Sequence, residues 1–432
     1  MAEQIFDRPA LLGSVLFVGP LATSACPPLA TPFLAILGVI VIGGALRRGA
    51  SWRDLLSPTY ALALCLLFAA YVFVNATWSA DPSLALRRAT VFAIIIVVSF
   101  VAVNAVAWLD DVSLRRAAPL FAAGALLGAL FVLLELLTHG LVTSTVMNHV
   151  AILHPKSPKH LQISQGRVIS MDLDQLNHNV GVVMFNLWPG LLALTSRSTV
   201  NRLAAMAVFF GTVAVVIMIS DHNSSQVALG GSTVIALATR YYPRLIVSTL
   251  AAAWCAAFVL VIPASFAAYE NGLHFASWLP GTARARVIIW QYTAEQVSKH
   301  PLLGVGVEST AVLNNLQKAA APPEQPEGFV YPRVLGSHAH DVYLQTWFEL
   351  GAIGAILFAL AGAAVAMLIF LVPAAAQPYV AGAFCTFAMV AAFSWGMWQM
   401  WFMSITALLP LLLRIASLRN RRVSSPPTSM FA

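Results

Sequence analysis

Two histidines, His338 and His340, close the longest polar loop of the sequence, and the chain then enters a long apolar stretch. Histidine is the side chain best suited to move a proton near neutral pH. Residues two apart point to opposite faces of a helix but share one face of an extended segment, so we expect one of the two to be functional. The segment 336–345 is therefore the first candidate for proton-transfer chemistry.

Polar residues follow the histidines at helical spacing. If a helix begins near Asp341, then Asp341, Gln345 and Glu349 recur every four residues and share one face. An ionisable group inside an apolar helix is costly and normally faces a bundle interior or a wet cavity, which favours a pocket below His340. A purely structural pairing of Glu349 with a helix neighbour is the alternative, and both interpretations stay open. Gly351, further along, is most simply explained by close helix packing.

Two arginines, Arg284 and Arg286, lie ahead of the histidines. Their segment, 283–299, mixes apolar and polar residues in a way that is typical of a helix lying along a membrane interface. Guanidinium groups offer paired donors that match phosphate oxygens, so the pair is a candidate clamp for a diphosphate. Contact with ordinary lipid phosphates is the alternative, and spacing alone favours it. His222 lies in a short polar turn, 221–226, which either lines the same pocket or is simply solvated.

The composition indicates that a bilayer is the solvent. Of the 432 residues, 59% are hydrophobic and 9% are charged, whereas soluble domains have about 25% charged residues. Apolar runs of about 20 residues recur along the chain, and helices satisfy their own backbone polar groups in lipid. We therefore predict an all-α, polytopic integral membrane protein. The predicted spans number about twelve and lie near 10–25, 28–46, 57–76, 89–108, 117–138, 179–195, 203–219, 226–239, 245–268, 345–371, 378–396 and 399–414.

The placement of arginine predicts the topology, because short cytoplasmic loops collect Lys and Arg. We assign to the cytoplasm both termini and the short arginine-containing loops at 47–53, 115–116, 197–202 and 240–244. The long loops 139–178 and 269–344 then lie on the outer side. We predict a single membrane domain over residues 1–432, into which the loop 269–344 and its interfacial helix are inserted.

Charge and cysteine content exclude several other classes. The net charge of +7 follows from the topological bias of arginine, so it does not indicate a nucleic-acid partner. The four cysteines lie in or beside apolar segments and not in the long outer loops. Neither a disulfide framework nor a metal-ligand cluster is implied.

An ordered set of motifs resembles the O-antigen ligase and polymerase superfamily of bacterial envelope proteins. The motifs are Trp78-Ser-Ala-Asp-Pro82, Arg286-Val-Ile-Ile-Trp290, His300-Pro-Leu-Leu-Gly304-Val-Gly306, and His340-Asp341 followed by Gly351-Ala-Ile-Gly354. The resemblance implies a glycosyltransferase of the bacterial inner membrane whose site faces the periplasm. Such proteins pass a glycan from undecaprenyl diphosphate to an acceptor hydroxyl, which belongs to the lipid A core in ligases and to a second lipid-linked glycan in polymerases.

The same resemblance assigns roles to residues. His340 matches the essential histidine of the family, and Arg286 matches the arginine ahead of the tryptophan. No metal or nucleotide cofactor is implied. The sequence departs from the family in having Asp341 after the histidine, and in having Asn-Ser-Ser-Gln at 223–226 where many members have a Ser-Arg pair. Arg284, Arg167 or protonated His222 are the candidate cations to replace that arginine.

The function that we expect is an inverting glycan transfer. Arg286, with Arg284 or Arg167, neutralises the leaving diphosphate, and His340 takes the proton of the acceptor hydroxyl. A proline-rich loop around Pro322, Pro323 and Pro326 is expected to cap the pocket. A polymerase is the alternative with the same chemistry, and a flippase or exporter of lipid-linked glycans is the alternative of another class. Polar insertions on one predicted side favour an enzyme over a transporter.

Overall fold

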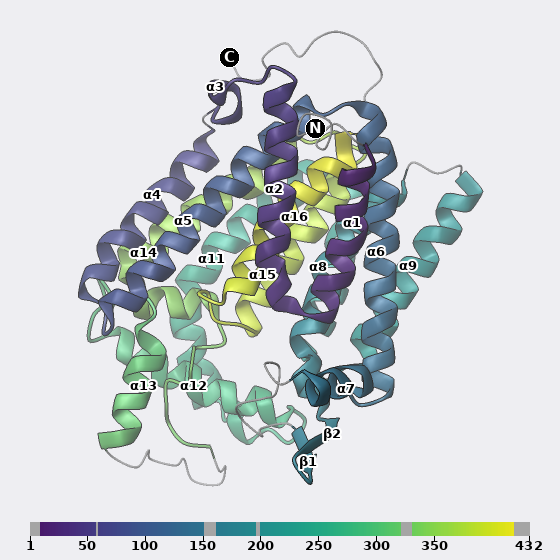
Figure 1. Ribbon diagram of the computed structural model, residues 1–432. Coiled ribbons are helices and arrows are strands. Elements are labelled where there is room, and N and C mark those ends of the chain that lie inside the picture. The colour runs from purple at the N-terminus through teal and green to yellow at the C-terminus, as the bar shows by residue number, and fades with distance from the viewer. Residues whose placement is uncertain (1–8, 58, 151–160, 196–198, 321–330, 419–432) are drawn as a thin grey trace. The chain divides into compact units, whose positions relative to one another are not determined.

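The computed structural model describes residues 9–57, 59–150, 161–195, 199–320 and 331–418 (Figure 1). Pro322, Pro323 and Pro326, expected in the capping loop, lie outside these residues. The chain divides into two compact units. The first comprises Met1–Ser57, Ser99–Asn223 and Leu408–Ala432, and the second comprises Pro58–Val98 and Ser224–Ala407. That residues 1–432 form one membrane domain stays a prediction.

The first unit contains seven described helices and a hairpin of two strands. They are α1 (Pro9–Ala25), α2 (Ala30–Arg47), α3 (Trp52–Leu55), α6 (Asp111–Leu137), α7 (Leu141–His149), β1 (Leu161–Ser164), β2 (Arg167–Met171), α8 (Asn177–Leu194) and α9 (Thr199–Ile219). Helix α6 packs against α1, α8 and α9. Small residues make the α1–α6 contact close: a Cβ atom at Gly124 would overlap the Phe17 carbonyl group.

The β-hairpin belongs to the loop 139–178, where no strand was predicted. Strands β1 and β2 pair antiparallel, and Gln165 and Gly166 join them with φ angles of 49° and 73°. Two central residues with positive φ form the type of turn that matches the twist of a two-stranded hairpin. The protein is therefore all-α apart from this short hairpin.

The second unit is built around α14 (Val342–Met367). The other helices that lie in it are α4 (Tyr60–Asn75), α11 (Pro243–Glu270), α12 (Gly281–Val297), α13 (Ser309–Ala320) and α15 (Gln377–Phe393). Helix α10 (Asn223–Tyr241) lies in it from Ser224 onward, and α5 (Pro82–Ala105) and α16 (Met400–Leu418) contribute residues to both units.

Helix α14 packs against α4, α11, α12, α13 and α15. Phe68 of α4 joins this packing to α5, because its ring meets Phe92 at 5.7 Å and stacks on Phe358 at 4.8 Å. Figure 1 shows α4, α5 and α14 running alongside one another. Ala294 and Val297 of α12 and Leu344 and Phe348 of α14 form a buried apolar cluster. Helix α12, predicted as 283–299, is thus held against the first turns of α14.

Each predicted span overlaps an observed helix. Among the described residues, eight helices are long and apolar enough to cross a membrane: α2, α4, α5, α6, α9, α11, α14 and α16. Helices α1 and α15 are apolar but shorter. The protein is therefore a multi-pass helical membrane protein, as predicted. The number of spans, the side on which the loops lie and the interfacial position of α12 stay predictions.

Candidate active site

Helix α12 presents two residues, one turn apart, that hold two other segments of the second unit. Arg286 Nη1 donates a hydrogen bond of 2.6 Å to the carbonyl oxygen of Phe393 and lies 3.5 Å from Ser224 Oγ. Trp290 Nε1 donates to the carbonyl of Ala339 at 3.0 Å. Residues four apart share a helix face. The spacing of the Arg-Val-Ile-Ile-Trp motif therefore lets one face bind the end of α15 and the histidine segment together.

His340 binds the carbonyl next to the one that Arg286 binds. Its Nδ1 lies 2.8 Å from the carbonyl oxygen of Ser394. A carbonyl only accepts, so Nδ1 carries the proton and Nε2 carries the lone pair in the neutral ring. The backbone of His340 has a φ of 54°, a conformation uncommon outside glycine. This tautomer is the one in which Nε2 acts as a base.

The pKa of His340 is lowered from 6.5 to about 4, mainly by burial and next by the positive charge of Arg286, while the hydrogen bond to Ser394 opposes both. The ring is therefore neutral over the physiological range. Helix ends leave carbonyl groups without helical partners, and cationic groups are favoured there. The end of α15 thus brings a guanidinium and a neutral imidazole to consecutive carbonyl groups.

His338 has a different hydrogen-bond role. Its Nδ1 accepts from the backbone N–H of His340 at 3.3 Å, and the two rings lie 4.0 Å apart. Gly396 lies directly against His338, because an added Cβ there would be 2.9 Å from the Cβ of the histidine. The neutral ring of His338 therefore carries its proton on Nε2. Of the two histidines, His340 is the one with an unprotonated Nε2.

The polar stripe predicted at the start of α14 is present, and all three side chains are buried. Asp341 Oδ1 accepts from the backbone N–H of Leu344 at 2.9 Å, so it caps the helix. Burial raises the pKa of Asp341 to about 7, against the effect of the hydrogen bonds from Leu344 and Tyr343. Gln345 Nε2 donates to Glu349 at 3.1 Å. That these residues line a substrate pocket stays a prediction.

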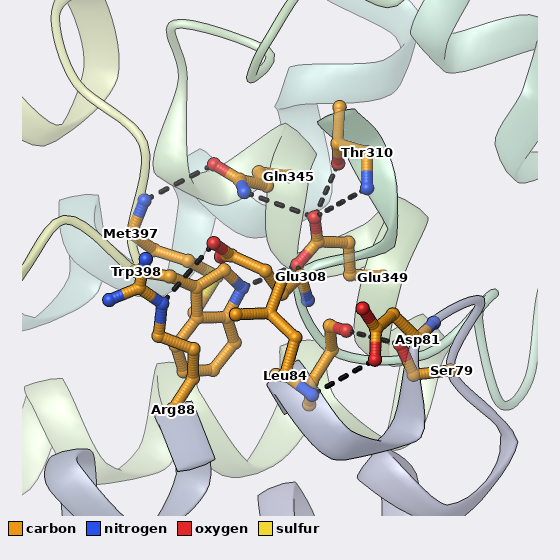
Figure 2. A network of polar contacts seen from close by, with 11 residues as sticks. Ser79, Asp81, Leu84, Arg88, Glu308, Thr310, Gln345, Glu349, Met397 and Trp398 are labelled. Carbon is orange, nitrogen blue, oxygen red and sulfur yellow. Dashed lines mark hydrogen bonds and ion pairs between the residues drawn. The ribbon is translucent and has the colours of Figure 1, made fainter. Parts of the chain in front are cut away.

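Glu349 lies at the centre of a dense polar network, which Figure 2 shows. Its side chain is fully buried and accepts hydrogen bonds from five donors. They are the backbone N–H of Glu308 (3.0 Å), the backbone N–H (3.1 Å) and hydroxyl of Thr310, Gln345 Nε2 and Trp398 Nε1. A buried carboxylate is costly unless its oxygens are satisfied in this way. The contact with Gln345 is a pairing with a helix neighbour, as the structural alternative expects, and a role of Glu349 in lining a pocket stays a prediction.

Glu308 is a second carboxylate beside this network. It has a φ of 58° and pairs with Arg88 Nε at 3.3 Å. The pKa of Glu308 is raised to about 7, mainly by burial and next by the charge of Glu349, while Arg88 opposes both. The sequence did not predict this pair, because Glu308 and Arg88 lie 220 residues apart and no pattern indicates that they are in contact.

Helix α14 is broken at Gly351, where φ is 65° and ψ is −168°. Backbone N–H and carbonyl groups near the break form hydrogen bonds with the segment 301–306 instead of within the helix. Val305 and Gly306 donate to the carbonyls of Phe348 and Glu349, and Ala352 donates to the carbonyl of Pro301, all at 2.9 to 3.0 Å. Irregular backbone inside a membrane helix is tolerated where protein groups satisfy it. The two family-like motifs that contain Gly304 and Gly351 therefore pack against each other.

The Trp-Ser-Ala-Asp-Pro motif also belongs to this region. Ser79 Oγ donates to the carbonyl of Val307 at 2.6 Å and lies 3.1 Å from Ser309 Oγ. Asp81 Oδ1 accepts from the backbone N–H of Leu84 at 3.0 Å, near the start of α5. The motif therefore holds the loop that carries the donors of Glu349 (Figure 2).

The remaining predicted residues have other positions. Arg284 lies in the first turn of α12, two residues before Arg286, so the two side chains leave the helix on different sides. Arg167 begins β2 and His222 follows α9, and both belong to the first unit. His222 is buried, with its backbone N–H 3.3 Å from Ser220 Oγ, and Arg167 is exposed. A role for these three in holding a diphosphate stays a prediction.

Within the described part of the chain, no three His, Cys, Asp or Glu residues are grouped so as to hold a metal ion. The chemistry that the described groups offer is proton transfer at His340 Nε2 and anion binding at Arg286. Residues 205–359 match the family model described as O-antigen ligase.

This region, less than half of the chain, is therefore similar to the O-antigen ligase family. The matched region includes Arg286, His340 and Glu349, and Arg167 and Ser394 lie outside it. No curated protein matches the chain. The match is consistent with a ligase-type membrane protein, and the donor, the acceptor and the mechanism are not shown by it.

The segment between α15 and α16, residues 394–399, was missed by sequence reasoning. It supplies the carbonyl that orients His340 and the indole of Trp398 that binds Glu349. The signal available was the sequence Ser394-Trp-Gly-Met-Trp398, which places two tryptophans and a glycine at the end of the predicted span 378–396 and just after it. We refer to residues 394–399 as the α15–α16 linker.

Proposed function

We propose that this O-antigen ligase-like protein transfers a glycan from undecaprenyl diphosphate to an acceptor hydroxyl, with a lipid A core sugar as the acceptor. The observation that carries the proposal is the pairing of Arg286 and His340 on the carbonyl groups of Phe393 and Ser394. A cation beside a neutral imidazole matches the two needs of such a transfer, which are to stabilise the leaving group and to deprotonate the nucleophile. Charge grows on the leaving diphosphate, and a proton leaves the attacking hydroxyl.

In the proposed step, the acceptor oxygen attacks the anomeric carbon while the bond from that carbon to the diphosphate oxygen breaks. The hydroxyl proton passes to His340 Nε2, and the undecaprenyl diphosphate leaves with the electron pair. Attack from the face opposite the leaving group inverts the anomeric configuration. General-base help of this kind is worth about 10² to 10⁴ in rate.

Arg286 is proposed to bind the diphosphate. A guanidinium offers forked donors that match phosphate oxygens, and donors already held in place stabilise growing charge without reorganisation. The hydrogen bond of Arg286 to Phe393 fixes the guanidinium before substrate arrives. Arg284, Arg167 and protonated His222 are proposed as further cations in place of the family's arginine near 223–226.

The lowered pKa of His340 leaves the ring unprotonated and available as a base, and it also makes the free ring a weaker base than an ordinary histidine. A ring that stays neutral down to about pH 4 is ready to accept a proton at any physiological pH. A bound diphosphate brings negative charge toward Arg286, which reduces the effect of that charge on the imidazole. Substrate binding therefore strengthens the base. No metal or nucleotide takes part in the proposed step.

We further propose that the site faces the periplasm of a bacterial inner membrane, with both termini in the cytoplasm. The support is the bias of arginine toward the short loops and the length of the loop 269–344 that leads to His340. Cysteine accessibility tests this topology: a Cys introduced at exposed Ser337 is expected to react with a membrane-impermeant reagent added outside spheroplasts. Labelling only after lysis would contradict it.

The experiment that tests the function gives the purified, reconstituted protein an undecaprenyl diphosphate glycan together with a lipid A core acceptor. The expected product is glycan attached to the core, released with free undecaprenyl diphosphate. A lengthened carrier-linked glycan would instead establish a polymerase. Movement of the labelled donor between leaflets without any new glycosidic bond would replace the transferase proposal with a transporter.

A further inference from the structure

Two side chains of α14, Gln345 and Glu349, hold the α15–α16 linker. Gln345 Oε1 accepts from the backbone N–H of Met397 at 3.2 Å, and Glu349 Oε2 accepts from Trp398 Nε1. Gln345 Nε2 also donates to Glu349 Oε1 at 3.1 Å, so the amide is fixed in orientation. Both side chains are at least 97% buried, with exposed fractions of 3% for Gln345 and 0% for Glu349.

The linker in turn holds both histidines. The Ser394 carbonyl accepts from His340 Nδ1 at 2.8 Å, and Gly396 packs on the side chain of His338. Ser394 is itself 2% exposed, and Met397 is 7% exposed. The carboxylate of Glu349 therefore contacts the linker at Trp398, and the linker contacts the imidazole of His340 at Ser394.

We propose that Gln345 and Glu349 are positioning residues that set the tautomer and orientation of His340 by fixing the α15–α16 linker. The inference rests on the proposed function of His340 as the base. It gives Gln345 and Glu349, two of the three residues of the polar stripe of α14, a role in orienting the base. A carbonyl held in one place selects the ring form with a proton on Nδ1, and this form leaves Nε2 unprotonated, as a base requires.

The carboxylate of Glu349 is also held by the segment 308–310. Glu308 and Thr310 donate backbone N–H groups to the two carboxylate oxygens. The anchor is rigid because every oxygen of Glu349 has at least two donors. A rigid support shell of this kind is what holds a reactive group within the small tolerance that catalysis allows.

The test replaces Gln345 with methionine, which has a similar length but neither accepts from Met397 nor donates to Glu349. The expected result is a fall in kcat of about 10- to 100-fold, with KM for the lipid-linked donor changed by less than about 3-fold. The direct readout is ¹⁵N NMR of the histidine rings, in which the His340 signal is assigned by its loss in His340→Ala. The signal is expected to change from the Nδ1–H form toward the Nε2–H form.

A second variant guards against a failure of Gln345→Met to fold. Trp398→Phe keeps an aromatic side chain of smaller size and removes the indole N–H that donates to Glu349, and it is expected to change the His340 tautomer in the same direction. Trp347→Phe is the matched control, because Trp347 Nε1 donates to the Phe258 carbonyl at 2.8 Å, away from the linker. The control is expected to leave both kcat and the tautomer unchanged.

The outcomes separate this inference from the proposed function. An unchanged Nδ1–H signal in both linker variants, or a change of equal size in Trp347→Phe, would overturn the positioning role. Absence of any glycan transfer by the wild-type protein would overturn the proposed function alone, since the tautomer is read without substrate. A rise in KM with kcat unchanged would assign Gln345 to donor binding and contradict the positioning role.

Discussion

The contact between Gly304 and Gly351 gives the most quantitative prediction. Gly351 has φ 65° and ψ −168°, a region of backbone conformation that is essentially restricted to glycine and costs other residues about 1 to 3 kcal/mol. An added Cβ would lie 2.6 Å from the backbone nitrogen of Gly304 and would overlap the Leu302 carbonyl. The main chain must therefore move in Gly351→Ala.

The movement breaks hydrogen bonds across the contact. The donors Val305, Gly306 and Ala352 bind carbonyl groups on the opposite side at 2.9 to 3.0 Å. Each buried polar group left without a partner costs about 1 to 3 kcal/mol. With one or two of these bonds lost and the backbone strain added, we expect the free energy of unfolding to fall by about 4 kcal/mol.

The assay is thermal unfolding in detergent micelles, followed by circular dichroism. Gly230→Ala is the matched control, because Gly230 lies in α10 with nothing within 4 Å of an added Cβ. That substitution is expected to leave stability unchanged or raise it by about 0.5 to 1 kcal/mol. For Gly351→Ala we expect Tm to fall by about 10 °C, at roughly 2 to 4 °C per kcal/mol for a unit of this size.

A double-variant cycle sharpens the prediction. Gly304 has a φ of 69°, and a Cβ there would overlap the Glu349 carbonyl on the far side of the same contact. Because either substitution opens the contact, Gly304→Ala and Gly351→Ala together are expected to cost less than the sum of the two single effects. A Gly351→Ala protein as stable as Gly230→Ala, or strictly additive effects in the cycle, would refute the broken-helix contact.

Three further predictions concern charge and pH. The acid limb of the kcat/KM profile is expected near pH 4, where His340 gains its proton, rather than at the 6.5 of an ordinary histidine; a limb at 6.5 or above would contradict the environment described for the ring. Arg286→Lys is expected to lower transfer by about 10-fold or more because a point charge lacks the forked donors, whereas Lys at exposed Arg244 changes little; equal activity of the two variants would return Arg286 to an ordinary lipid contact. The pKa of Glu308 is raised from 4.5 to about 7 in the folded protein, so the free energy of unfolding is expected to be larger at low pH than at high pH by roughly 3 kcal/mol. This contribution is fully present below pH 4.5 and is lost as pH rises through 7. Thermal unfolding between pH 5 and pH 8 is therefore expected to lose much of this slope in Glu308→Gln, and an unchanged slope would exclude Glu308 as its source.

The helices were predictable because a bilayer leaves the backbone few choices. An apolar stretch of sufficient length becomes a helix to satisfy its own polar groups, so each predicted span overlaps an observed helix. The hairpin was missed although its signal is present in the sequence. Alternation in Arg167-Val-Ile-Ser-Met171 after the turn Gln165-Gly166 is typical of a strand.

The candidate site was predictable only in part. The types of Arg286 and His340 indicated their chemistry, but the carbonyl groups that hold them have no side-chain signature. Gly351 was interpreted as a site of close packing, and it does pack closely on Leu302, yet the break in the helix depends on a backbone angle that no residue pattern displays. Glu349 was correctly placed inside the protein, whereas its five donors come from three separate stretches of chain, at 308–310, Gln345 and Trp398.

The central claim is that Nε2 of His340 is the base in glycan transfer from a polyprenyl diphosphate. The measurement that tests it most directly compares initial transfer rates of wild-type, His340→Ala and His149→Ala proteins at saturating donor and acceptor. His149 is the matched control, since its Nδ1 also lies 2.8 Å from a backbone carbonyl, that of Thr145, on the exposed helix α7. We predict that His340→Ala folds and loses about 10² to 10⁴ in rate, while His149→Ala keeps wild-type activity. Transfer by His340→Ala at the wild-type rate would contradict the account.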